Sequence, residues 1–126
     1  MLTRMEIEQQ ISEIQWYHEF DFGDGLVACP KTKDLETHRK LWRFIRAELD
    51  KIDFANKSVL DIGCWDGYWS FYSERRGAGR VLATDDSGQN WAGESGFHLA
   101  RELLGSSVEY DLSRSIYRLE SLGAKF

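Results

Sequence analysis

One stretch, residues 58–85, has the residue order of a complete strand–helix–strand unit, and few folds accommodate such a unit. Ser58–Ile62 and Arg80–Thr84 are short apolar runs typical of buried parallel strands. Between them, Tyr68–Arg76 has a helical pattern with glycines at both of its ends. Asp85 follows the second strand directly. This order, a strand, a glycine turn, a helix and a second strand followed by an acid, is typical of nucleotide-binding folds. It predicts a nucleotide-type cofactor site at the carboxyl edge of a parallel sheet.

The glycine turn excludes two common nucleotide sites. Dinucleotide-binding turns need G-x-G-x-x-G, because a pyrophosphate approaches the bare backbone. Here the glycines are Gly63 and Gly67, and Trp65 takes the middle position, where it would crowd a pyrophosphate. No Gly-Lys-Ser/Thr follows, so the turn is not a P-loop. These features disfavour NAD, FAD and nucleoside triphosphates.

Acidic residues around the turn indicate a ligand without phosphate. Asp61 ends the first strand and Asp66 lies inside the turn, so both would repel phosphates and attract an ammonium group. A carboxylate at Asp85 can accept hydrogen bonds from both hydroxyls of a ribose. A ligand with a ribose and an amine but no phosphate fits S-adenosylmethionine.

The segment Asp61–Gly67 resembles motif I of the class I S-adenosylmethionine-dependent methyltransferases, and Asp85 stands where that family places its ribose-binding acid. The resemblance implies an α/β fold, a Rossmann-like three-layer αβα sandwich, and methyl transfer by direct displacement at the sulfonium. It implies no metal. The residues expected to bind the cofactor are Asp61, Gly63, Cys64, Trp65, Gly67, Asp85, Asp86 and Asp111.

A closer resemblance is to the tRNA wobble-uridine methyl- and carboxymethyltransferases. It rests on Trp16-Tyr17-His18 followed by an acid and Gly25, and on the sequence VLDIGCWDGYWSF, and it spans about residues 11–110. It implies tRNA as a candidate acceptor and a carboxylated cofactor as an alternative. A carboxylated cofactor needs a nearby cation, for which Lys31 and Lys33 are the candidates.

The family's sheet continues through a fourth strand and three more, and residues 122–126 resemble the approach to that fourth strand. We therefore expect a C-terminally truncated chain that holds only strands 1–3 of the sheet plus N-terminal helices. Ser58–Ile62 would then be an exposed edge. This predicts a homo-oligomer, or a sheet completed by another chain.

The sequence divides into a helical and aromatic extension, residues 1–57, and a cofactor-binding half-domain, residues 58–126. In the extension, Thr3–Ile14 is predicted as a helix because Thr3 and Glu6 have capping-box spacing. Residues 26–33 are predicted as a loop. Asp34 is expected to cap a helix that runs to about Asp50. In the half-domain, a helix is expected over residues 92–104 and a third strand over residues 108–110, while residues 114–122 are weakly patterned.

Aromatic residues and acids interleave over residues 16–25, and two interpretations stay open. The aromatic side chains would either wall a ligand or pack the N-terminal helix onto the domain. His18 has a pKa range suited to a general base, yet a histidine among aromatics is more often structural. Tyr17 and His18 are the candidates for catalysis on the acceptor side.

Composition limits the remaining possibilities. The 126 residues suit one domain, and the net charge of −5 argues against a generally basic nucleic-acid-binding protein. Residues 31–51 nevertheless carry a local net charge of +3, which suits a phosphate or carboxylate partner or a solvated helix face. No apolar run approaches the ~20 residues of a membrane span. Cys29 and Cys64 have no disulfide or metal-ligand spacing, which indicates the cytoplasm.

Three hypotheses therefore stand. The first is a methyltransferase, or its cofactor-binding part, with RNA as the candidate acceptor. The second is a non-catalytic binding or assembly module that keeps the fold. The third is a dehydrogenase fragment, against which Trp65 argues.

Overall fold

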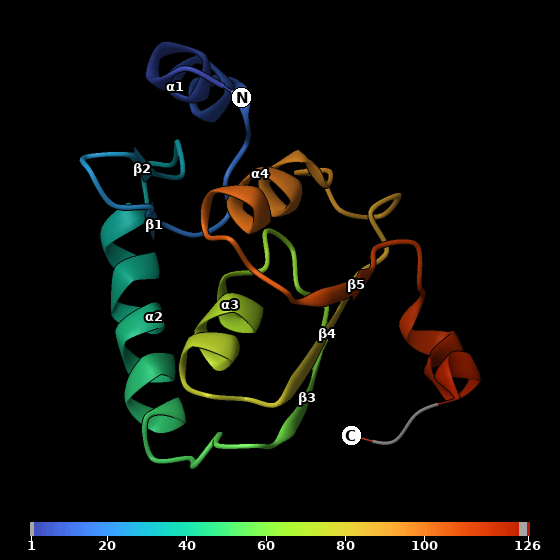
Figure 1. Cartoon of the computed structure of the whole chain (residues 1–126). Coiled ribbons are helices and arrows are strands. Elements are labelled where there is room, and N and C mark those ends of the chain that lie inside the picture. Colours follow the sequence, from blue (N-terminus) through green and yellow to red (C-terminus); the bar gives the residue numbers. More distant parts are fainter. Residues whose placement is uncertain (1, 124–125) are drawn as a thin grey trace.

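The computed structural model describes residues 2–123 and 126 (Figure 1). The elements, in chain order, are α1 (Arg4–Glu13), β1 (Phe20–Asp21), β2 (Val27–Ala28), α2 (Leu35–Leu49), β3 (Ser58–Ile62), α3 (Tyr68–Arg75), β4 (Arg80–Thr84), α4 (Ser95–Leu103), β5 (Glu109–Asp111) and a 3-10 helix, η1 (Ile116–Leu122).

The predicted strand–helix–strand unit is confirmed. Strands β3 and β4 have the predicted bounds and are parallel, with Val59 opposite Val81 and Ile62 opposite Thr84. Strand β5 is parallel to β4, so the order is β3-β4-β5. The fold is α/β with a parallel sheet, as predicted. The third strand begins at Glu109, one residue later than expected.

Three helices gather on one side of this sheet. Figure 1 shows α2, α3 and α4 on that side and η1 on the other. Val81 and Ala83 of β4 join Phe71 of α3 and Phe97 of α4 in the hydrophobic core. Because side chains alternate along a strand, Leu82 points to the opposite face. Among the described residues, η1 is the only helix on that second face.

The N-terminal segment packs into the same core. Trp16 and Phe20 are buried against Phe71 and Phe97, so residues on both sides of the predicted boundary after Lys57 share one core. Gly96 of α4 makes room for this contact, since a Cβ there would lie 3.3 Å from the Trp16 ring. For Trp16, packing is the correct interpretation. The Thr3 half of the predicted capping box is confirmed, because Thr3 Oγ1 accepts a hydrogen bond from the Glu6 N–H at 3.2 Å.

Residues 20–28 form a short hairpin that the sequence did not predict. Gly23, Asp24 and Gly25 all have positive φ, which reverses the chain between β1 and β2. Two-residue strands show too little alternation to be recognised in a sequence, so the predicted loop over residues 26–33 was partly wrong.

Two helix starts also differ from the predictions. Asp34 precedes α2, but its side chain makes no capping hydrogen bond. Helix α4 begins at Ser95 rather than near residue 92, because residues 86–94 form turns that include Gly93 at φ +71°. These turns place polar side chains at the carboxyl end of β4.

The exposed edge of the sheet is β3, which pairs with β4 alone within the described part of the chain. Ile62 is 49% exposed there. Completion of the sheet by another chain stays a prediction, which light scattering of the purified protein would test. The expected approach to a fourth strand lies partly outside the described residues, at positions 124–125, and Leu122 ends η1. Across residues 2–123 and 126, no helix has the length and apolar character needed to cross a bilayer.

Candidate functional site

The glycine turn is bound to the end of β4 by its own backbone. The N–H groups of Gly63 and Cys64 both donate to the Thr84 carbonyl, at 2.8 and 2.9 Å. The next N–H, of Trp65, donates to Asp85 Oδ2 at 3.1 Å. A phosphate-binding turn leaves such amides free for its ligand. Here three successive amides are occupied, in agreement with a ligand that lacks phosphate.

A cavity of about 440 Å³ opens beside this turn, at the carboxyl ends of β3 and β4. We call it the adenosyl cavity, after the ligand that the sequence predicts for it. Four of the eight predicted cofactor residues line it: Gly63, Trp65, Asp85 and Asp86. The sequence did not single out its other wall residues: Thr84, Gln89, Asn90, Arg114, Ser115, Ile116 and Tyr117. For most of these residues, the only sequence signal of a site was their position shortly after β4 or β5.

Asp85 is the most constrained side chain of the adenosyl cavity. Its Oδ2 accepts from Trp65 N–H and from Asn90 Nδ2, the latter at 2.8 Å. Its Oδ1 accepts from the Asp86 N–H at 2.9 Å. A carboxylate offers about four lone-pair positions, and three are occupied here, so one remains for a ligand hydroxyl. These donors hold the carboxylate in place while the side chain stays partly exposed.

The other four predicted cofactor residues do not line the cavity. Cys64 is buried, and burial raises the pKa of its thiol. Gly67 faces the Phe71 and Phe97 rings. The carboxylate of Asp111 is bound to Arg114 Nε at 2.8 Å, and this bond lowers its pKa. Arg114 itself, rather than Asp111, lies in the cavity wall.

Asp61 is the fourth predicted residue outside the cavity lining. Its Oδ2 accepts a hydrogen bond from Ser70 Oγ at 2.6 Å, and Ser70 is buried at the start of α3. Removal of the carboxylate from water raises its pKa, and the negative charges of Asp85 and Asp66 add to this effect. The folded protein therefore binds this proton more tightly than the unfolded chain does.

We expect Asp61→Asn to unfold at a higher temperature than the wild type at pH 7. The amide oxygen of asparagine can still accept the hydrogen bond from Ser70. The substitution also removes a buried negative charge whose desolvation is costly. Because the folded-state pKa is raised, this cost exists above that pKa and disappears as the pH falls through it. Thermal unfolding followed by circular dichroism between pH 4 and 8 should show the difference shrinking toward acid. Asp24→Asn, at an exposed turn, is the control, and a less stable Asp61→Asn at pH 7 would contradict the argument.

Asp66 does not face a ligand, contrary to the interpretation from sequence. Its buried carboxylate accepts from the N–H groups of Tyr17 and His18, both at 2.8 Å, and contacts His18 Nδ1 at 2.6 Å. All its partners lie in the aromatic segment that precedes the hairpin. Asp66 therefore anchors this segment to the glycine turn, and His18 is buried with it.

The anchored segment gives the adenosyl cavity an aromatic neighbour. Tyr17 stacks on Trp65, with 4.8 Å between ring centroids and 16° between planes. Trp91 lies 5.5 Å from Trp65. Tyr17 thus adjoins the cavity, while His18 lines a different one, beside Trp42 and Tyr68. Neither Lys31 nor Lys33 lines the cavity, and Lys31 Nζ donates to the Ser12 carbonyl at 2.7 Å.

Parallel strands, an acid after the second strand and a cavity at their carboxyl ends define a Rossmann-like cofactor fold. No family model matches this chain. It is 29% identical over 100 residues to the ribosomal protein L11 methyltransferase of Alteromonas mediterranea; the match covers 63% of this chain and 34% of that protein. The chain thus spans about a third of that relative's length.

Among solved structures, the chain is similar to the ribosomal protein L11 methylase of Lactobacillus delbrueckii subsp. bulgaricus. The TM-score is 0.53 at 19% identity, and the match covers 80% of this chain and 58% of that one. At this identity the similarity shows the fold alone, a mixed α/β fold with a parallel sheet that is similar to the Rossmann-like fold of that methylase. Neither comparison confirms the resemblance to the tRNA wobble-uridine enzymes.

Proposed function

We propose that the chain binds S-adenosylmethionine in the adenosyl cavity and forms the cofactor-binding part of a methyltransferase. The observation that carries this proposal is the carboxylate of Asp85, held by three donors at the end of β4 and opposite Gly63 in the cavity wall. Such a carboxylate suits a ribose diol. The occupied amides of the turn argue against a dehydrogenase, which must bind a pyrophosphate.

Each part of the cavity has a role in this proposal. A Cβ added at Gly63 would have no atom within 4 Å, so the space beside this backbone is open. The methionine part of the cofactor can therefore approach it closely. The aromatic group around Trp65 suits a sulfonium, a contact worth about 0.5–2 kcal/mol. Ile116 and Tyr117 form an apolar wall for the adenine. Bound S-adenosylmethionine supplies an electrophilic methyl group, and the protein contributes mainly by fixing its position.

We expect Asp85→Ala to weaken the binding of S-adenosylhomocysteine by about 10- to 100-fold. A hydrogen bond to a charged group contributes about 1.5–3 kcal/mol, and the ribose loses its acceptor. Isothermal titration calorimetry checks this, with micromolar binding expected for the wild type. Asp85→Asn retains one acceptor oxygen and should lose less. Asp21→Ala, an acid outside the cavity, is the control.

The absence of heat with both S-adenosylmethionine and S-adenosylhomocysteine, in a folded wild-type sample, would refute the proposal. The same titration with a carboxylated S-adenosylmethionine tests the alternative cofactor. Arg114 is the one cation among the described residues that line the cavity. It is therefore the residue that a carboxylated cofactor would have to reach.

The acceptor is proposed to be a protein. Similarity to two proteins named for ribosomal protein L11 supports this choice over tRNA. A radiolabelled-methyl assay with two substrates, a ribosomal protein fraction and bulk tRNA, separates the possibilities. Label in the protein fraction is expected, and label in tRNA would favour the wobble-uridine resemblance. Cofactor binding without transfer to either would favour the non-catalytic module.

A further inference from the structure

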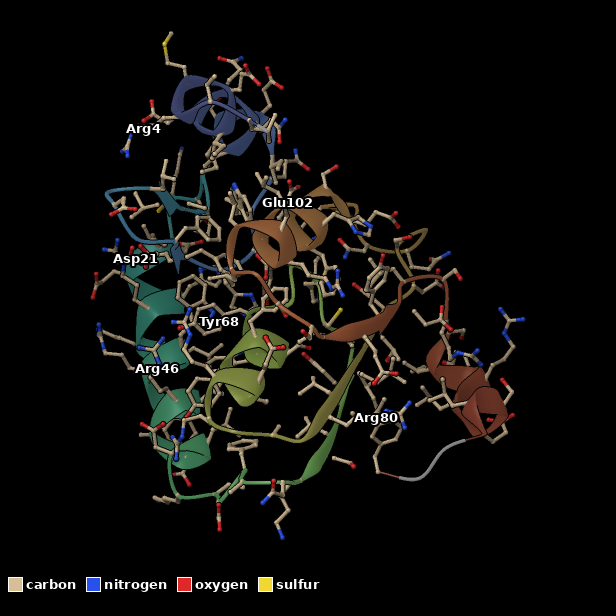
Figure 2. The ribbon with its side chains drawn as sticks, in the orientation of Figure 1. Arg4, Asp21, Arg46, Tyr68, Arg80 and Glu102 are labelled. Atoms are coloured by element: carbon tan, nitrogen blue, oxygen red, sulfur yellow. The ribbon has the colours of Figure 1, made fainter. Side chains whose placement is uncertain are left out.

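Two adjoining cavities, of about 500 and 330 Å³, lie between α2, α3 and the β1–β2 hairpin. They share Glu19, Arg46 and Tyr68, and we call them together the arginine cleft. Figure 2 shows Arg46 of α2 and Tyr68 of α3 in the space between these helices. The cleft is separate from the adenosyl cavity and shares no lining residue with it.

The smaller cavity of the cleft is cationic. Helix α2 contributes Arg39, Arg43 and Arg46, which share one helix face because they are spaced by four and three residues. Glu19 is the single acid of this cavity, and it forms a two-bond pair with Arg39 at 2.6 and 2.9 Å. The charges of Arg43 and Arg46 are left in excess, in a chain whose net charge is −5.

The two remaining arginines have weak partners. Arg43 lies 3.6 Å from Glu36, and its side chain is 62% exposed. Arg46 donates to the neutral hydroxyl of Tyr68, and its guanidinium lies 5.7 Å from the centroid of that ring. Within the described chain, Arg46 forms no ion pair. An anion would therefore give Arg46 a charge-assisted bond that Tyr68 does not supply.

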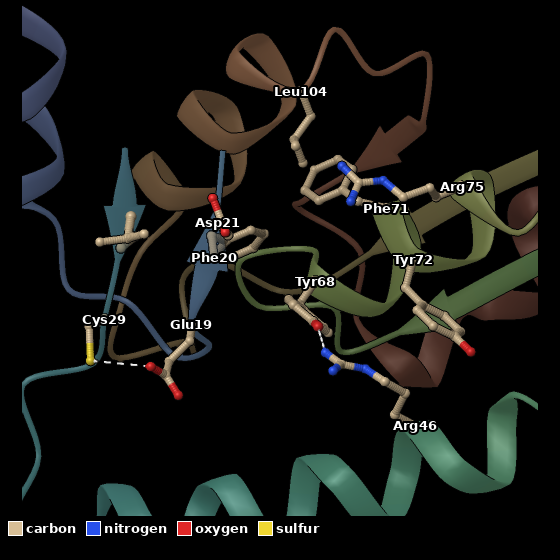
Figure 3. A pocket seen from close by; sticks show the side chains of 12 residues that line it. Glu19, Phe20, Asp21, Cys29, Arg46, Tyr68, Phe71, Tyr72, Arg75 and Leu104 are labelled. Carbon is tan, nitrogen blue, oxygen red and sulfur yellow. Dashed lines mark hydrogen bonds between the residues drawn. The ribbon is translucent and has the colours of Figure 1, made fainter. Parts of the chain in front are cut away.

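The larger cavity continues the cleft with apolar side chains, and the charged side chains of Asp21 and Arg75 also line it. Phe20 of β1, Phe71 of α3 and Leu104 after α4 line it (Figure 3). Figure 3 shows Arg46 and Tyr68 pointing toward each other, with Phe71 and Leu104 at the opposite end. Cavities of about 300–1,000 Å³ with mostly apolar walls and a few polar groups are typical of small-molecule sites.

We propose that the arginine cleft binds an amphiphilic anion, a phosphate or carboxylate attached to a flat apolar body. The anionic head lies between Arg43 and Arg46, since planar guanidinium groups match both oxyanions with paired hydrogen bonds. The body lies across Tyr68 toward Phe20 and Phe71. This site goes beyond the proposed methyl transfer and does not depend on it.

Cys29 provides a local readout of occupancy. Its thiol is exposed and lines the larger cavity, whereas Cys64 is buried. Partial burial raises the pKa of the Cys29 thiol, so alkylation by neutral iodoacetamide should be measured at alkaline pH. Mass spectrometry gives the rate with phenyl phosphate, benzoate, inorganic phosphate or benzyl alcohol present.

Phenyl phosphate and benzoate should slow the alkylation of Cys29. Inorganic phosphate lacks the body and benzyl alcohol lacks the charge, so each should need about tenfold higher concentration for the same effect. Whichever of phenyl phosphate and benzoate protects at lower concentration identifies the head group. If neither protects Cys29 in the wild type, the proposal is wrong.

The double variant Arg43→Met/Arg46→Met should lose this protection. Lys33→Met/Lys40→Met removes the same charge from exposed positions outside both cavities and should retain it. Equal loss in both variants would show a general field effect and overturn the proposal. If the arginine double variant unfolds, Arg43→Met alone makes the same test on an exposed side chain. S-adenosylhomocysteine binding should be unchanged in all variants. A wrong assignment of the adenosyl cavity would therefore be detected by this titration and not by the alkylation of Cys29.

Discussion

Asp66→Ala is expected to destabilise the folded protein by about 3–5 kcal/mol, because breaking a buried, hydrogen-bonded charge leaves its partners without compensation. Two backbone N–H groups, of Tyr17 and His18, and the imidazole of His18 would all lose their acceptor. His18 is 5% exposed, so water cannot readily replace the carboxylate. The aromatic segment would detach from the glycine turn.

Urea unfolding followed by circular dichroism measures this loss. Asp66→Asn retains one acceptor oxygen and should lose less stability. Asp21→Ala, an exposed acid that accepts only the Gly23 N–H among the described contacts, should change stability by about 0.5 kcal/mol or less. An Asp66→Ala variant as stable as Asp21→Ala would show that the segment is held by packing alone.

The second large effect is expected at Gly67. Its φ is +83°, and a Cβ there would lie 2.6 Å from Phe97 Cδ2 and 2.8 Å from Phe71 Cε2. The left-handed conformation costs a non-glycine residue about 1–2 kcal/mol, and overpacking adds about 1–3 kcal/mol. Both rings are fully or almost fully buried. We expect Gly67→Ala to destabilise the protein by about 2–5 kcal/mol.

Gly63→Ala is the matched control for Gly67→Ala. Gly63 has a similar φ of +72° but open space around its Cβ, so only the conformational cost of about 1–2 kcal/mol applies. Urea unfolding should rank the two variants in this order. Calorimetry should rank the cofactor affinities of the two variants the other way. Gly63→Ala should lose more affinity than Gly67→Ala, since it places a methyl group where we propose that the cofactor approaches. Equal stability of the two variants would mean that Phe71 and Phe97 move aside without cost.

Some assignments from sequence failed for a common physical reason. Asp66 was interpreted as a ligand-facing acid because it stands in the glycine turn, yet its partners are 48 and 49 residues away in the chain. Asp111 was expected to bind the cofactor on the strength of the family resemblance, and the cavity wall contains its partner Arg114 rather than Asp111 itself. Which way a side chain points depends on contacts that sequence spacing does not encode.

The parallel strands, the helix between them and the acid after β4 were determined by the sequence alone. Their signals are local: apolar runs of five residues, glycines at sharp turns and a carboxylate in the next position. Only the tertiary structure decided which predicted residues line the adenosyl cavity and which lie outside its wall. It also formed the arginine cleft, where α2, α3 and the hairpin meet. Long-range packing makes these decisions because a cavity exists only between elements that are distant in the chain.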